Sequence, residues 1–189
     1  LSMKAGERFN VVPDKAEAVF NGHLSEEQAE TLKSAGASDV VFEGANTIVK
    51  TRGTSAHAMN PEFGVNAAVK LFGALKAISW GEDELQNHIA YLAEILSSTD
   101  GSGIGIQCRD DVSGPLTCNA GILRHENGVC TVSLDIRYPV TLDGEKIYKI
   151  IEEKAARDGL TPKLAGENKP LFVPADTPLI KKLLEAYKN

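Results

Sequence analysis

The chain has 189 residues, with 20 Lys and Arg against 26 Asp and Glu, which give a formal net charge of −6. Because a nucleic-acid-binding protein needs a basic face, this balance argues against a nucleic-acid partner. Hydrophobic residues make up 42% of the chain, yet no apolar run approaches the ~20 residues of a membrane-spanning helix, so the composition predicts a globular protein with one full core and no membrane segment.

The first third of the chain predicts a β-β-α-β-β-α order. The expected elements are extended segments at 8–14 and 15–21, a helix from the capping box at Ser25 to Gly36, strands at 39–43 and 47–52 joined by a turn at 44–46, and a helix with Pro61 in its first turn. This order is typical of helices packed on one face of a largely antiparallel sheet. The predicted fold class is therefore α+β, a two-layer sandwich.

The second half predicts a further helix, a hairpin and a last helix. A helix with an apolar face is expected at 85–96 and a polar loop at 97–105. Three extended segments are expected within 105–138, with turns at 113–115 and 126–128. A final αβ unit follows, whose helix carries Ile147, Ile150, Ile151 and Ala155 and ends at Gly159. In the last extended segment Cys130, Val132, Leu134 and Ile136 alternate with polar residues. Arg137 is therefore expected to stand opposite the core-facing row.

The last residues differ from the rest, which predicts a main domain at 1–168 and a separate tail at 169–189. Residues 169–174 have the composition of an extended linker, and Thr177 and Pro178 form a helix start with Pro at its first position. The helix that follows carries an apolar stripe to the end of the chain at Asn189, with no partner element after it. We expect this tail, as a linker and the truncated start of a further helix, to pack loosely or against a neighbouring molecule.

The three cysteines, Cys108, Cys118 and Cys130, are odd in number and lie ten and twelve positions apart, so the sequence has no Cys-x-x-Cys pair. A reduced, cytoplasmic setting is the simplest explanation of this pattern. Cys130 lies in the alternating apolar row, so we expect it to be a core thiol rather than a reactive one.

His57 is the candidate catalytic residue. It lies on a short connector between the strand ending at Gly53 and the helix that follows Pro61. The small neighbours Ser55, Ala56 and Ala58 leave the imidazole uncovered, so the ring can reach a group outside its own domain. A surface or capping histidine is the alternative interpretation.

Three segments resemble a known family. Gly-Thr-Ser-Ala-His-Ala at 53–58, followed by Pro61, Gly64, Asn66 and Ala67, resembles the signature of the lid or dimerization domain of di-zinc metallopeptidases, which include aminoacylases, carboxypeptidases and dipeptidases. The segments 10–16 and 134–139 resemble the corresponding lid segments of the dipeptidase V branch, which is related to carnosinases. The resemblance covers about residues 6–189 and implies an enlarged, ferredoxin-like lid.

The resemblance implies a role for three residues in dipeptide hydrolysis. His57 would donate a hydrogen bond to the developing oxyanion, Arg137 would bind the carboxylate of the peptide substrate, and Asn10 would make a polar contact with it. The chemistry suits these residue types, because an imidazole N–H stabilises new negative charge and a guanidinium binds a carboxylate in two parallel hydrogen bonds.

The resemblance also implies two zinc ions, for which the sequence offers no ligand set. The four histidines are His23, His57, His88 and His125, and no His-x-Asp occurs. We therefore expect the zinc ions to be bound by a catalytic domain of the same protein outside this chain, which alone would be inactive. The resemblance leaves open whether the intact protein is a monomer or a homodimer. Two alternatives need no catalysis: a stand-alone αβ module that binds a small molecule, and a dimerization module with an incidental His57.

Overall fold

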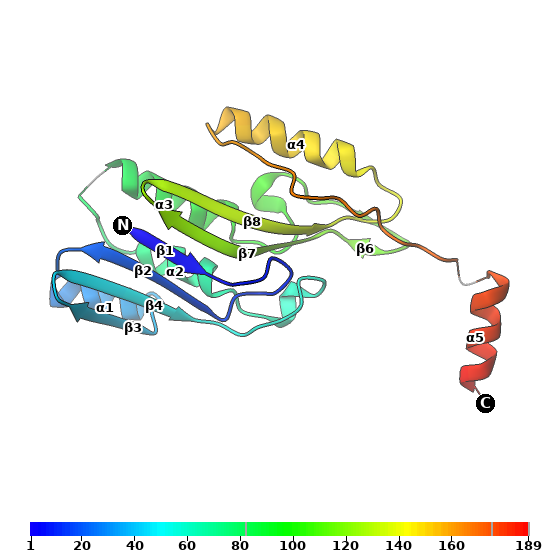
Figure 1. Ribbon diagram of the computed structural model, residues 1–189, viewed down its shortest axis with the longest axis horizontal. Helices are drawn as coiled ribbons and strands as arrows, with labels where there is room; N and C mark the ends of the chain where they lie inside the picture. The colour runs from blue at the N-terminus through cyan, green and yellow to red at the C-terminus, as the bar shows by residue number, and fades with distance from the viewer. Residues whose placement is uncertain (82, 175, 189) are drawn as a thin grey trace.

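The computed structural model describes residues 1–81, 83–174 and 176–188. A six-stranded sheet in the order β3-β4-β2-β1-β7-β8 forms one layer, and every neighbouring pair is antiparallel. Helices α1, α2 and α3 cover one face of the sheet, and α4 lies along its β8 edge (Figure 1). This arrangement confirms the predicted α+β sandwich.

The strands are β1 Ser2–Ala5, β2 Lys15–Asn21, β3 Asp39–Glu43, β4 Asn46–Arg52, β7 Thr117–Glu126 and β8 Val129–Arg137, with a separate two-stranded ribbon of β5 Arg109–Asp110 and β6 Gly114–Pro115. The helices are α1 Glu26–Ser34, α2 Ala67–Leu75, α3 Asp83–Ile95, α4 Gly144–Arg157 and α5 Pro178–Lys188, with two 3-10 turns, η1 Pro61–Phe63 and η2 Ser102–Ile104.

The main core lies between the sheet and α2. Leu71, Phe72 and Leu75 of this helix are fully buried and pack with Leu32 of α1 and Ile89 of α3. A second cluster joins α4 to the end of the sheet through apolar side chains, which are Ile104, Ile106, Leu116, Cys118 and Ile147. Both clusters pack against Ile95 of α3 and Leu134 of β8, so α4 extends the same core.

Local sequence signals explain where several elements begin and turn. Ser25 caps α1, because its hydroxyl accepts from the Gln28 N–H and the Gln28 side chain accepts from the Ser25 N–H, as the capping box predicts. Asn127 and Gly128 both have positive φ between β7 and β8, which confirms the predicted hairpin turn.

The N-terminal strand was missed and the predicted extended segment at 8–14 is wrong. β1 pairs with β2 on one side and β7 on the other, so it lies inside the sheet. With four residues and only Met3 and Ala5 facing the core, β1 is too short to give a periodic signal. Residues 8–14 instead form an irregular loop, since Pro13 has no N–H and the Val11 N–H closes a turn onto the Arg8 carbonyl.

Two further boundaries differ from prediction. Pro61 begins the separate turn η1, and α2 starts only at Ala67, where the Asn66 side chain accepts from the Ala68 N–H. After α4 no strand follows among the described residues 160–174, so the predicted αβ unit lacks its strand.

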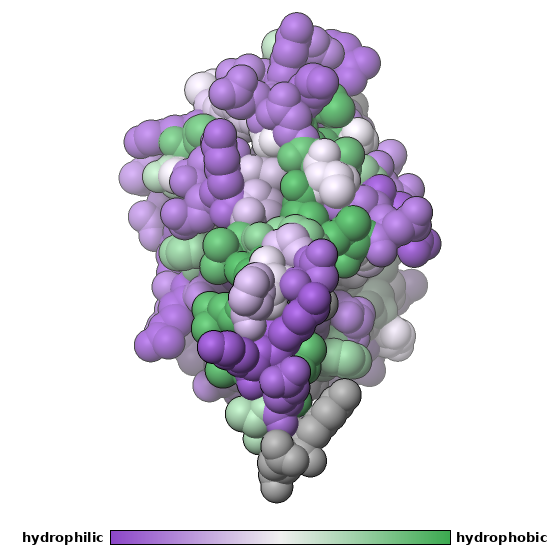
Figure 2. Space-filling model, turned by 90° about the vertical axis from the view of Figure 1, so that its right-hand side faces the viewer, coloured by the Kyte–Doolittle hydropathy of each residue, from purple (hydrophilic) through white to green (hydrophobic). Residues whose placement is uncertain are grey.

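The C-terminal tail stands apart from the sheet (Figure 1). Leu171 and Tyr187 are more than nine-tenths exposed, and α5 also presents Leu179, Leu183 and Leu184 to solvent. Figure 2, viewed from this end, shows apolar surface among hydrophilic side chains. Asn189 lies outside the described residues, and the division into domains at 168 and 169 stays a prediction.

Deleting residues 1–5 should abolish cooperative thermal unfolding, because the deletion removes a strand with two buried side chains from the middle of the sheet. The control is a chain that ends at Pro174. Its thermal-unfolding midpoint should lie within about 2 °C of that of the full chain, since the tail contributes little burial. Circular dichroism on heating measures both. A cooperative transition in the chain without residues 1–5 would contradict the central position of β1.

Candidate functional site

Two loops run side by side at one end of the sheet and bring Asn10 next to His57. Val11 and His57 form an isolated antiparallel β-bridge. On either side of it, the Ala58 N–H donates to the Asn10 carbonyl (3.0 Å) and the Val12 N–H donates to the Ala56 carbonyl (2.9 Å). The loop that follows β1 therefore fixes the backbone on both sides of His57.

The ends of β7 and β8 bring Arg137 to the same region. The Thr117 hydroxyl donates to the Ala58 carbonyl over 3.2 Å, and Thr117 is the register partner of Arg137. Ala58 is thus bonded through its N–H to Asn10 and through its carbonyl to the strand beside Arg137. The structure brings all three residues that the resemblance singled out to one end of the fold.

His57 presents a free ring N–H to its surroundings. Its side chain is exposed, as the small neighbours predict, and Nδ1 accepts from the Met59 N–H over 3.1 Å. Because Nδ1 acts as an acceptor, the proton of the neutral ring is on Nε2. His57 can therefore donate one hydrogen bond to a group outside this loop.

The guanidinium of Arg137 is held from one side by Asp135. Arg137 Nε lies 2.9 Å from Oδ1 of Asp135 and Nη2 lies 3.4 Å from Oδ2, and the Asp135 side chain is only 8% exposed. This pairing leaves Nη1 and part of Nη2 free, on a side chain that is 40% exposed. A second carboxylate can bind the outer edge of the fork. Asp135 was missed as the partner, although it shares a strand face with Arg137.

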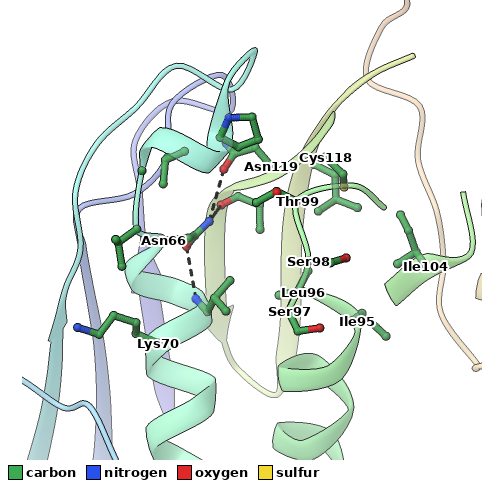
Figure 3. A pocket seen from close by; sticks show the side chains of 17 residues that line it. Asn66, Lys70, Ile95, Leu96, Ser97, Ser98, Thr99, Ile104, Cys118 and Asn119 are labelled. Carbon is green, nitrogen blue, oxygen red and sulfur yellow. Dashed lines mark hydrogen bonds between the residues drawn. The ribbon is translucent and has the colours of Figure 1, made fainter. Parts of the chain in front are cut away.

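Asn119 is a buried residue that sequence reasoning missed. Its amide nitrogen donates to the carbonyls of Phe9 (3.2 Å) and Val11 (3.1 Å), and its oxygen accepts from Asn66 Nδ2 (3.4 Å). Asn66 also caps α2, so it joins the helix start to β7 (Figure 3). The signal was an asparagine inside an otherwise apolar stretch of strand, where β propensity disfavours it.

A β-bulge lets the first loop approach the sheet closely. The register of β7 and β8 shifts between Ala120 and Ile122, which leaves Gly121 as the extra residue. A Cβ on Gly121 would overlap the Phe9 carbonyl oxygen, so only glycine allows the Phe9 backbone to lie there. The bulge and the loop together determine how closely the backbone at Asn10 approaches the sheet.

A small pocket lies behind these loops. It has a volume of ≈170 Å³ and is lined among others by Asn66, Thr99, Cys118 and Asn119 (Figure 3). Ligand pockets are typically about 300–1,000 Å³, so this space is too small for a dipeptide. Burial raises the pKa of the Cys118 thiol to about 12, and the charges of Asp135 and Asp100 add to the shift. The thiol therefore stays protonated and is no nucleophile.

The described part of the chain contains no group of three or more His, Cys, Asp or Glu side chains placed to hold a metal ion. In particular, His57 belongs to no such group among these residues. Among the same residues, no helix combines the length and the apolar character needed to cross a membrane.

The whole chain is similar to part of several curated proteins, although no family model matches it. "Putative dipeptidase YtjP" of Bacillus subtilis is 32% identical over 199 aligned residues, and two Staphylococcus aureus proteins with the same type of name, from strains USA300 and MW2, are each 26% identical over 199. Each alignment covers 100% of this chain but 42% of the other protein, so the chain spans less than half the length of these relatives.

Replacing Asn119 by alanine should lower the free energy of unfolding by about 2–3 kcal/mol, because two carbonyls and one amide lose a buried partner. Hydrogen exchange at the Val12 and Ala58 amides should also accelerate as the loops loosen. Asn87→Ala, on the exposed side of α3, is the control and should change stability by less than about 0.5 kcal/mol. Wild-type stability and exchange in Asn119→Ala would refute the role of Asn119.

Proposed function

We propose that this chain is the lid part of a zinc-dependent dipeptidase and supplies groups that bind the substrate and stabilise the transition state. The observation that carries the proposal is the convergence of Asn10, His57 and Arg137 through the backbone of Ala58. The names of the similar proteins, and the fact that the chain spans 42% of their length, support a dipeptidase of which this chain is one part.

His57 is the proposed electrophilic group. In peptide hydrolysis water adds to the carbonyl carbon, the carbonyl oxygen gains negative charge, and the C–N bond then breaks as the amine takes up a proton. The Nε2–H of His57 would donate to that oxygen, with the ring held in this tautomer by the Met59 N–H. Because the charge exists only after addition, the hydrogen bond favours the transition state over the bound substrate.

Arg137 is the proposed carboxylate-binding group. Every unmodified dipeptide ends in a carboxylate, and the outer edge of a guanidinium binds this group in two parallel hydrogen bonds. Asp135 would keep the fork oriented and partly neutralise it before the substrate arrives. Asn10 is the proposed additional polar contact to the substrate, because its backbone is fixed beside the His57 loop.

The remaining parts of the proposed enzyme lie outside this chain. Because the described residues do not form a metal-binding cluster, we assign the two zinc ions to a catalytic domain of the same protein. The exposed apolar residues of α5 are consistent with a continuation into that domain. For the intact protein we propose a cytoplasmic location and either a monomeric or a homodimeric state.

In the intact protein, His57→Ala should lower kcat by roughly 10²–10³-fold with little change in KM, as expected for loss of an oxyanion donor. Steady-state hydrolysis of Ala-Ala measures both constants. His23→Ala is the matched control, because His23 is exposed and its contacts are the Gly44 carbonyl in the β3–β4 turn and the ring of Phe42. An unchanged kcat in His57→Ala would refute the assigned role.

Arg137→Ala should raise KM strongly, and Arg137→Lys should not restore it, because a point charge does not reproduce the two parallel hydrogen bonds. Part of the loss is expected in kcat, since a displaced substrate reacts more slowly. Arg157→Ala, at the exposed end of α4, serves as the control.

A dipeptide with an amidated C-terminus separates the two roles. With this substrate, wild type and Arg137→Ala should differ much less in kcat/KM than they do with the free acid. The lower kcat of His57→Ala should persist. If amidation affected both variants equally, the two roles would be wrongly assigned.

A further inference from the structure

A groove crosses the face of the sheet that the helices leave open. It has a volume of ≈710 Å³ and runs from β1, β2 and β4 to the loop that follows β1. Along β2, Ala16, Ala18 and Phe20 point into the core, so Lys15 and Glu17 project into the groove from the other face. Its volume lies within the range of about 300–1,000 Å³ that is typical of ligand pockets.

The lining of the groove is basic although the chain as a whole is acidic. Six basic and three acidic side chains line it, in a chain of net charge −6. Lys4 is paired with Glu17 over 3.1 Å, and Arg124 donates to the carbonyls of Ala5 and Gly6, which fixes the loop. Four further basic side chains line the groove and make neither an ion pair of this kind nor such bonds to a carbonyl among the described residues. They are Arg8, Lys15, Lys50 and Arg52.

Lys15 and Arg52 carry like charges at facing positions of the sheet. They are direct register partners on β2 and β4, and both side chains are exposed. Like charges at directly opposite positions destabilise an antiparallel pair, and within the described ranges neither residue forms an ion pair. A bound anion would offset this repulsion, because both cations could then contact the same negative charge.

The groove ends beside the proposed catalytic residues. Val11 and Ser55 line this end. Val11 is the bridge partner of His57, and Ser55 precedes His57 by two residues on the same loop. A peptide whose scissile bond lies at His57 can therefore extend a side chain toward Lys15 and Arg52.

We infer that Lys15 and Arg52, with Arg8, form a subsite for the acidic side chain of a short peptide. The inference rests on the proposed function, since it names the substrate class of the same site. It predicts a preference for dipeptides with Asp or Glu over those with the uncharged amides, because carboxylate-bearing side chains gain charge-assisted hydrogen bonds there.

Binding can be measured on the 189-residue chain without catalysis, by following backbone amide resonances during titration with Ala-Glu and with Ala-Gln. Ala-Glu should bind at least about fivefold more tightly, the size expected for one charge-assisted hydrogen bond at a partly exposed site. Ala-Glu should shift the amide resonances of Lys15, Arg52 and Ser55. The difference in affinity between Ala-Glu and Ala-Gln should decrease at high salt. Equal affinity for the two peptides would overturn the inference.

Arg52→Gln and Lys15→Gln should each remove most of the preference, and their thermal midpoints should stay equal or rise because the like-charge repulsion is relieved. Lys76→Gln, an exposed lysine at the end of α2, is the matched control and should retain the preference. A preference that survives in Arg52→Gln and Lys15→Gln would also overturn the inference.

The two proposals can fail separately. If the chain prefers Ala-Glu through Lys15 and Arg52 but the intact protein hydrolyses no dipeptide, the proposed function is wrong and the acidic subsite stands. If the intact protein cleaves Ala-Gln and Ala-Glu with equal kcat/KM and the chain binds both equally, the function stands and the subsite is wrong.

Discussion

The buried amide of Asn119 is the contact on which the candidate site depends. It donates to the carbonyls of Phe9 and Val11, on both sides of Asn10, and accepts from Asn66, the residue that caps α2. Because a buried carbonyl left without a partner costs about 1–3 kcal/mol, these bonds hold the irregular loop to the sheet. The loop in turn bonds to the backbone around His57, so a strand residue with no proposed contact to substrate determines where the imidazole stands.

Stability and function are separated along the sheet. The helix-covered face carries the core, whereas the end formed by the two loops carries a β-bulge at Gly121, an arginine paired through Asp135 and a free imidazole N–H. The open face adds the Lys15 and Arg52 pair, which lowers stability unless an anion binds.

Periodic and capping signals predicted most elements, because they act within a few residues. The capping box at Ser25 and the turn at Gly128 are of this kind, and the structure confirms them. Along β8 the apolar row packs against the core only partly buried, and Asp135 of the opposite row is buried as well. β1 was missed because its pairing with β2 and β7 is a long-range contact that leaves little pattern in four residues. Asn119 was missed for the same reason, since its partners are more than fifty residues away in the sequence.

If His57 and Arg137 contact the same peptide substrate from the lid side, both should contact a bound analogue of that substrate. The test is a structure of the intact protein with a non-hydrolysable phosphinate analogue of a dipeptide. We expect His57 Nε2 within about 3 Å of a phosphinate oxygen and two hydrogen bonds from the outer edge of Arg137 to the terminal carboxylate. An analogue bound with neither residue in hydrogen-bond contact would show that the two proposed roles are wrong.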